Sequence, residues 1–364
     1  MDEEITRLLQ MQGGAASGRE LQRGGFSRRS VEIMVRRGEL VRVRRDALVL
    51  ASALAGSTPW ERQALVARAV GRSLAATASD STTHALSHES ALMVHGLPWF
   101  GEDGLIHLVR TDGRRGRRDG TVWVHRPVDA RWTVELDGLV LVAPAMAALQ
   151  VAATHGAEAG LVALDGVLHA AQEQDKEGDG RPENPAAAQV GQEVAEALEE
   201  GFGSATPTVR LVVDLADGRG ESAGESRTRW LVHVLGLGPC IPQFVVHDGD
   251  QLVGIVDLKL ARWDVLVEFD GTGKYTGHGA LLAEKDREDR LRAPGTRWSG
   301  SGGPTWPART WSAAASSRRS PAPRPGRPRS AEIGVEQRPG RTGPRGTGGA
   351  GMDAVARGPV GCHP

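Results

Sequence analysis

The chain has 364 residues, a formal net charge of −1 and 40% hydrophobic residues, which leaves room for two or three domains with buried cores. The near-neutral charge excludes a polycation that binds nucleic acid over its whole surface, so basic contacts must lie in local patches. Two cysteines exclude a disulfide framework. The sequence has no apolar run long enough to cross a bilayer and no signal-peptide pattern, so we expect a cytoplasmic protein with no membrane partner.

The first fifty-five residues have the pattern of three helices and two strands. Residues 2–12 place apolar side chains on one helical face, and Ser17 and Glu20 have the spacing of a capping box. Ser27 can cap a third helix over 28–37. The segments LVRVRR and DALVL then alternate like two short strands. This order predicts a winged-helix domain over residues 1–55.

Residues 19–45 carry nine arginines and three glutamates, a local charge of +6. A helix of this size fits the major groove of DNA, and arginines of the wing reach phosphates. Double-stranded DNA is therefore the expected partner, although a winged helix that only packs against a protein neighbour is the alternative. The predicted DNA-binding residues are Arg28, Arg29, Arg36 and Arg37 on the helix and Arg42, Arg44 and Arg45 on the wing.

The string GRELQRGGFSRRSVEIMVRRGELVRVRRDALVL resembles the N-terminal domain of AbiEi-type antitoxins, the repressor halves of some toxin–antitoxin pairs. SHESALMVHGLPWF and the strands after it resemble the domain that follows in those proteins. The resemblance covers about residues 5–165 and implies a DNA-binding regulator with a cognate toxin as a partner. Where that second domain usually has a proline–arginine pair, this chain has Pro144 and, two positions later, Met146.

Residues 56–170 predict a mixed α/β domain. Helices are expected over about 58–71 and 86–95, followed by a hairpin of LIHLVR and TVWVHR across a basic turn, a strand LDGLVLVA and two helices. The turn carries Arg114, Arg115, Arg117 and Arg118, and a solvated turn is favoured over a phosphate contact. His84, His88 and His95 suggest zinc by spacing alone. Without a cysteine or a well-placed carboxylate, we expect them on a helix surface.

Residues 171–205 are acidic and contain Pro182 and Pro185, which predicts a linker followed by a surface helix. Residues 206–293 then predict the last domain. It begins with two helices, TPTVRLVVDLADG and ESRTRWLVHVLG, and continues with a hairpin of QFVVHD and QLVGIVDLKL. A third strand, WDVLVEFDG, and a charged helix, LLAEKDREDRLRA, complete it.

Carboxylates gather at the strand ends of this domain. Asp257 closes one predicted strand, and Glu268 and Asp270 lie two apart on another, so both project from the same face. Glu225 on the preceding helix is the natural fourth member. Converging carboxylates repel one another, and Mg²⁺ or Mn²⁺ bound by Asp257 and Glu268 would remove that cost. Such an ion can activate water and stabilise the charge that develops on a phosphodiester, and Lys274 or Lys259 could stabilise the same charge. The alternative is that these carboxylates are solvated acids at strand ends.

Four blocks over about residues 221–293 resemble the domain of unknown function related to very-short-patch-repair endonucleases, within the PD-(D/E)xK nuclease superfamily. The blocks are ESAGESRTRWLVHVLGL, GIVDLKL, VLVEFDGTGKY and LLAEKDREDRLRA. The resemblance implies that Glu225 is the helix acid, Asp257 the first strand acid and Glu268 the second. The usual lysine two positions later is Asp270 here, so Lys274 would have to take its role. The implied catalytic residues are Glu225, Asp257, Glu268, Asp270 and Lys274.

Residues 294–364 contain eleven prolines and eleven arginines but no leucine, phenylalanine or lysine. Such a segment cannot bury enough apolar surface to offset its conformational entropy, so we expect a disordered tail. It is either a native basic arm or the product of a frameshift, since the nuclease family continues here with a strand and a helix. Back-translation of 295–306 from the third base of each codon permits YAVVRVWRADLA, which has that pattern.

The sequence therefore predicts an α+β multidomain protein with a winged helix, a mixed middle region, an incomplete restriction-endonuclease-like domain and a tail. The predicted function is that of a metal-dependent DNA endonuclease-like protein placed on duplex DNA by its winged helix. The alternative is an antitoxin-type transcriptional regulator that binds DNA without cleaving it.

Overall fold

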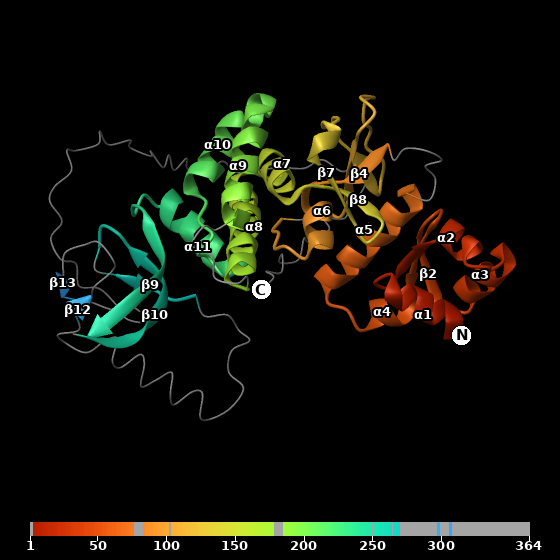
Figure 1. The fold of residues 1–364 in the computed structure, drawn as a ribbon, viewed down its shortest axis with the longest axis horizontal. Coiled ribbons are helices and arrows are strands. Elements are labelled where there is room, and N and C mark those ends of the chain that lie inside the picture. The colour runs from red at the N-terminus through yellow and green to blue at the C-terminus, as the bar shows by residue number, and fades with distance from the viewer. Residues whose placement is uncertain are drawn as a thin grey trace, which may run out of the picture. The chain divides into compact units, whose positions relative to one another are not determined.

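The fold is mixed α and β, with several separate sheets (Figure 1). Contacts divide the chain into Met1–Trp311 with Cys362–Pro364, and Ser312–Gly361, which lies outside the described residues. Within the described ranges, no helix is long and apolar enough to cross a membrane. The computed structural model describes residues 3–75, 83–101, 103–177, 185–248, 250–263, 265–269, 297–298 and 306–307.

The predicted helices and strands of the first fifty residues are confirmed, and a third strand is added. Ser17 Oγ accepts the Glu20 amide at 3.1 Å while Glu20 Oε2 accepts the Ser17 amide at 2.7 Å, which is the predicted capping box. The added strand, β1, pairs with β3 to give the antiparallel order β1-β3-β2. The elements are α1 (Glu3–Met11), β1 (Ala15–Ser17), α2 (Gly18–Arg23), α3 (Arg28–Arg36), β2 (Leu40–Arg44) and β3 (Ala47–Leu50).

The middle region has a five-stranded sheet of order β6-β5-β4-β8-β7. Its largest buried side chains come from both the sheet and the helices, among them Leu86, Leu92, Leu108, Leu141 and Leu149. The strands are β4 (His84–Leu86), β5 (Ile106–Arg110), β6 (Val122–Val124), β7 (Thr133–Leu136) and β8 (Leu139–Val142). The helices are α4 (Ala51–Ala55), α5 (Pro59–Ala75), α6 (His88–His95), the 3-10 turn Ala130–Trp132, α7 (Pro144–His155) and α8 (Ala157–Glu177).

The predicted hairpin of β5 and β6 is wrong, because these two strands are parallel, with Ile106 opposite Val122. Residues 111–121 run back along the sheet before β6 begins. Asp119 stabilises that return, since its Oδ1 accepts the amides of Thr121 at 3.0 Å and Val122 at 2.9 Å. A segment of this length can bring the chain back so that β6 runs in the same direction as β5, which the alternating pattern cannot reveal.

The middle core also extends past the boundaries predicted at 171 and 206. Helix α9 (Pro185–Glu199) buries Val194 and Ala197 in it, and α10 (Thr206–Leu215) buries Val209 and Val212. A 3-10 turn, Gly203–Ala205, joins the two helices. The acidic segment thus contributes one apolar helical face to the core, and α10 packs with α7 and α8 rather than with the last sheet.

The last sheet has the order β11-β10-β9 and a small core that includes Phe244, Val246 and Val256. The predicted β9–β10 hairpin is confirmed, whereas β11 covers only two residues of the predicted third strand. The charged helix predicted over 281–293 and the predicted tail lie outside the described residues, except for β12 (Arg297–Trp298) paired with β13 (Trp306–Pro307). The other elements are α11 (Ala223–Val234), β9 (Cys240–Asp248), β10 (Gln251–Leu260) and β11 (Leu266–Val267).

Candidate functional site

Helix α3 carries arginines on its outer face. It buries Val31 and Met34 in the N-terminal core, so the positions that alternate with them on the helix point away from the core. Within the described ranges, none of the arginines of α3 or its C-cap is within ion-pair distance of an acidic side chain. These exposed arginines are Arg28, Arg29, Arg36 and Arg37.

The arginines of the β2–β3 hairpin are more constrained. Arg42 donates to Glu32 Oε1 at 2.7 Å and to the Arg45 carbonyl at 2.9 Å, so it ties the hairpin to α3. Arg44 lies 3.3 Å from Asp119 Oδ2, while Arg45 is exposed in the turn. Because part-exposed ion pairs are weak, these contacts hold the Arg42 and Arg44 side chains only loosely.

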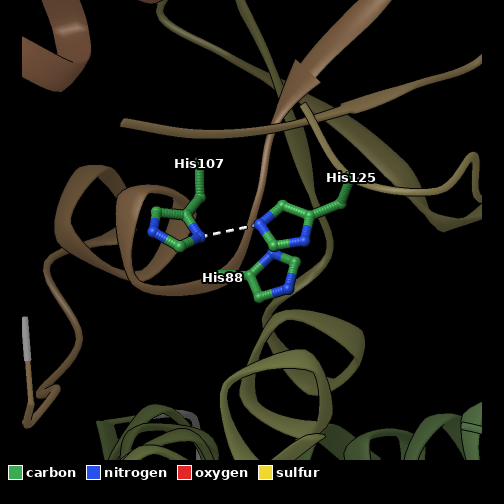
Figure 2. A group of neighbouring side chains, drawn as sticks. All are labelled: His88, His107 and His125. Atoms are coloured by element: carbon green, nitrogen blue, oxygen red, sulfur yellow. Dashed lines mark hydrogen bonds between the residues drawn. The ribbon is translucent and has the colours of Figure 1, made fainter. Parts of the chain in front are cut away.

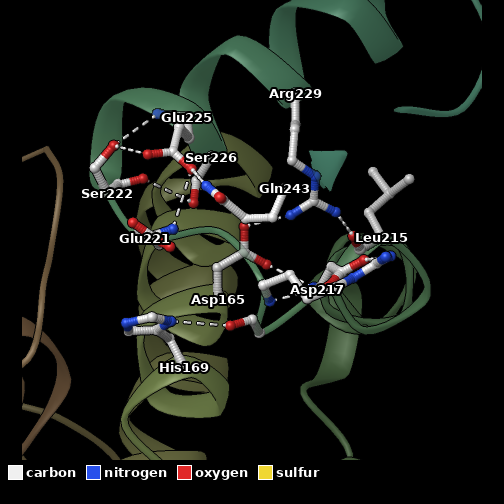
Figure 3. Close-up of polar contacts among 12 residues, drawn as sticks. Asp165, His169, Leu215, Asp217, Glu221, Ser222, Glu225, Ser226, Arg229 and Gln243 are labelled. Atoms are coloured by element: carbon white, nitrogen blue, oxygen red, sulfur yellow. Dashed lines mark hydrogen bonds and ion pairs between the residues drawn. The ribbon is translucent and has the colours of Figure 1, made fainter. Parts of the chain in front are cut away.

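Glu225, the predicted helix acid, is buried at the start of α11, where its carboxylate binds the N-cap residue Ser222. Its Oε1 accepts Ser222 Oγ at 2.8 Å, and its Oε2 accepts the Glu221 amide at 3.1 Å (Figure 3). Gln243 Nε2 on β9 donates to the same Oε2 at 3.2 Å. With both oxygens engaged, Glu225 fits a supporting role better than that of a metal ligand.

The strand acids lie close to this cap. The register of β9 and β10 places Asp257 across from Gln243, between the pairs Val256–Phe244 and Leu258–Pro242. Asp257 Oδ2 accepts the amide of Phe269 at 2.6 Å, so it lies beside the backbone that follows Glu268. The Phe269 ring packs against Gly224, where a Cβ would overlap it.

The contacts of Gln243 with Glu225, of Asp257 with the Phe269 amide, and of the Phe269 ring with Gly224 therefore place Glu225, Asp257 and Glu268 in one region of the last domain. Among the described residues, Glu225, Asp257 and Glu268 do not form a group of three whose oxygens all lie within 4.8 Å of one another. Asp270 and Lys274, the other predicted catalytic residues, lie outside the described residues.

A histidine cluster in the middle region was not anticipated from the sequence. His88 and Glu89 begin α6, His107 lies on β5, His125 follows β6, and His155 ends α7. Figure 2 shows three of these rings gathered together. The predicted surface position is wrong for His88, which is only 4% exposed, and His88 does not gather with His84 and His95. His84 contacts its neighbour Thr83 at Oγ1 at 3.0 Å, and His95 contacts the Val142 carbonyl on β8 at 3.1 Å.

The cluster has two halves that share His107. On one side, His107 Nδ1 lies 2.8 Å from His125 Nε2, and the ring of His88 stacks on that of His125 with centroids 3.8 Å apart. On the other side, Glu89 Oε1 lies 3.0 Å from His107 Nε2 and 3.2 Å from His155 Nε2. Asp103 Oδ1 also lies 3.1 Å from His107 Nε2. Only tertiary contacts join these residues, so no sequence spacing could have found them.

Burial and charge divide the cluster electrostatically. Burial lowers the pKa of His88 well below its usual value and lowers that of His125 to about 3, so both rings are neutral near pH 7. Burial also lowers the pKa of His107, but the carboxylates of Glu89 and Asp103 outweigh it and raise that pKa overall. Burial raises the pKa of Glu89, yet the imidazoles of His107 and His155 hold it well below its usual range. Glu89 is thus an ionised carboxylate in the interior.

Comparison with known proteins adds no assignment, because no protein-family model matches the sequence and no curated protein has significant similarity to it. The residues and their geometry are therefore the basis for inferring a function.

Proposed function

We propose that this protein is a DNA-binding regulator of antitoxin type, which binds duplex DNA through α3 and the β2–β3 turn. The observation that carries the proposal is the row of exposed arginines on α3, opposite its buried apolar face. An α-helix is about 10–12 Å wide with its side chains, which matches a major groove about 12 Å wide. Arg28 and Arg29, in the first turn, are placed to contact base edges or the phosphates beside them, because the N-terminal residues of recognition helices enter the groove.

Affinity for duplex DNA is expected to fall steeply with salt. If four of the arginines contact phosphates, raising the salt from 50 to 200 mM weakens binding by about 150-fold, because each contact releases counterions. Fluorescence anisotropy with a labelled duplex, measured with and without Mg²⁺, tests this. A binding constant that barely changes with salt would contradict the proposal, whereas insensitivity to Mg²⁺ favours a regulator over a nuclease.

A second candidate is a metal-dependent DNA endonuclease, favoured by the linkage of Glu225, Gln243, Asp257 and Phe269 described above. Asp257 and Glu268 are the residues that would hold Mg²⁺ or Mn²⁺, and carboxylate oxygens suit such hard cations. The ion, when bound, would activate water and stabilise the charge of the phosphodiester. In this proposal Gln243 positions Glu225, and Glu225 fixes the start of α11 beside the strand acids.

Nicking of supercoiled plasmid in Mg²⁺ or Mn²⁺ tests the second candidate. We expect Glu268→Ala to abolish nicking without changing DNA affinity, because it removes a ligand of the ion but no arginine. Glu199→Ala, at an exposed acid on α9, is the matched control and should nick normally. If the folded wild type binds DNA but never nicks it, the nuclease candidate is excluded and the regulator stands.

A further inference from the structure

The buried face of the middle sheet carries a second candidate metal site, formed by side chains from three separate elements. Glu89 comes from the first turn of α6, His107 from β5 and His155 from the end of α7. Their nearest oxygen and nitrogen atoms all lie within 4.8 Å of one another. Glu89 is 1% exposed and His107 is completely buried, so water does not solvate the carboxylate freely.

The polar atoms of this group are close together but do not satisfy one another. Glu89 Oε1 lies 3.0 and 3.2 Å from the two imidazole nitrogens, yet neither approach has the direction of a hydrogen bond. Within the described residues, both oxygens of Glu89 and Nε2 of His155 are buried without a hydrogen-bond partner. The two imidazoles offset part of the cost of burying this charge, but its oxygens still lack hydrogen bonds, so a further partner is expected at this point.

We propose that Glu89, His107 and His155 bind a divalent transition metal of the Zn²⁺ class. Zinc bonds of about 2.0–2.2 Å in a tetrahedron separate neighbouring ligand atoms by roughly 3.3 Å, close to the 3.0 and 3.2 Å observed. Two imidazoles and one carboxylate form a ligand set typical of zinc, with a fourth position left for water or a further ligand. Mg²⁺ is a poorer fit because it prefers oxygen ligands.

Two histidines around the group support this assignment, whereas one carboxylate competes with it. Coordination through Nε2 places the His107 proton on Nδ1, which then donates to His125 Nε2 at 2.8 Å. The His88 ring stacks on His125 and holds that acceptor in place. His88 has a left-handed backbone with φ of +52°, a strained conformation for a residue with a side chain. Asp103, which binds the same Nε2 at 3.1 Å, competes with the ion for it.

Titration of the full-length, metal-stripped protein with Zn²⁺ tests the site. We expect one tightly bound equivalent, a higher melting temperature in its presence, and visible absorption bands when Co²⁺ replaces Zn²⁺. Glu89→Gln keeps the shape of the side chain but removes its charge, and His155→Asn removes one nitrogen ligand. Each should weaken Zn²⁺ binding by more than the roughly 10–100-fold that loss of a supporting hydrogen bond costs.

Two control variants separate this site from other metal binding. His169→Asn removes a histidine that binds the Gly218 carbonyl outside the cluster, and Glu268→Ala removes the acid of the proposed nuclease site; both should retain the Zn²⁺ equivalent. Binding that survives Glu89→Gln and His155→Asn, or is lost equally in the controls, overturns the proposal. If the cluster variants do not fold by circular dichroism, the wild type decides alone: Co²⁺ bands support the site, and their absence overturns it.

Discussion

Replacing Arg229 with methionine is expected to destabilise the protein by about 3–5 kcal/mol, the cost of leaving a buried charge without its partner. Arg229 donates to Asp165 Oδ2 at 2.6 Å and to the Leu215 carbonyl, which joins α11 to α8 (Figure 3). The side chains of Asp165 and Arg229 are only 1% and 10% exposed. Asp165 Oδ1 also accepts the Asp217 amide at 2.8 Å, so the carboxylate cannot turn toward water without breaking a second contact.

Urea denaturation of wild type and Arg229→Met at pH 7 measures this loss. Burial raises the pKa of Asp165 although Arg229 opposes it, and removing Arg229 raises that pKa further. As pH falls through this raised pKa, Asp165 of the variant takes up a proton in the folded state and the unpaired buried charge is removed. The difference in the free energy of unfolding between wild type and Arg229→Met should therefore narrow as pH falls. Arg219→Met is the matched control: its ion pair with Asp217 is half exposed and should contribute at most about 1 kcal/mol. Equal losses of unfolding free energy in Arg229→Met and Arg219→Met would contradict the prediction that the buried Arg229–Asp165 ion pair contributes more to stability.

The double variant Arg28→Glu, Arg29→Glu is expected to weaken duplex binding on the order of 100-fold at moderate salt, and to reduce the salt slope by about two. Both side chains are exposed in the first turn of α3 and are not among its buried residues, so stability should change little. Reversing the charge of these two side chains removes two proposed phosphate or base contacts and adds repulsion between the new glutamates and the DNA backbone. Anisotropy titrations at several salt concentrations measure both quantities.

Arg114→Glu with Arg115→Glu is the charge-matched control, since both lie exposed in the loop between β5 and β6. Because the total charge changes equally, a similar loss in this control would show that DNA responds to overall charge or to that loop. A loss confined to the α3 variant would locate the interface on the helix.

Local patterns predicted most individual elements because each depends on neighbours in the chain. The capping box at Ser17 and Glu20 and the β9–β10 hairpin follow from side-chain type and spacing alone. The arginines of α3 are exposed because apolar side chains on the opposite face, such as Val31, must be buried. The sequence also marked Glu225, Asp257 and Glu268. It predicted that Asp257 closes its strand, whereas β10 continues to Leu260, and it did not show that the Glu225 carboxylate binds the N-cap residue Ser222.

What the sequence by itself determined is therefore most of the local elements and the exposed basic face of α3. Only the tertiary structure decided the parallel pairing of β5 and β6, because strand direction depends on the path of residues 111–121. The same holds for the placing of α9 and α10 in the middle core. The tertiary structure also brings together Glu89 from a helix start, His107 from a strand and His155 from a helix end. Residues so far apart in the chain meet only when the sheet and its helices pack, and no local spacing records that contact.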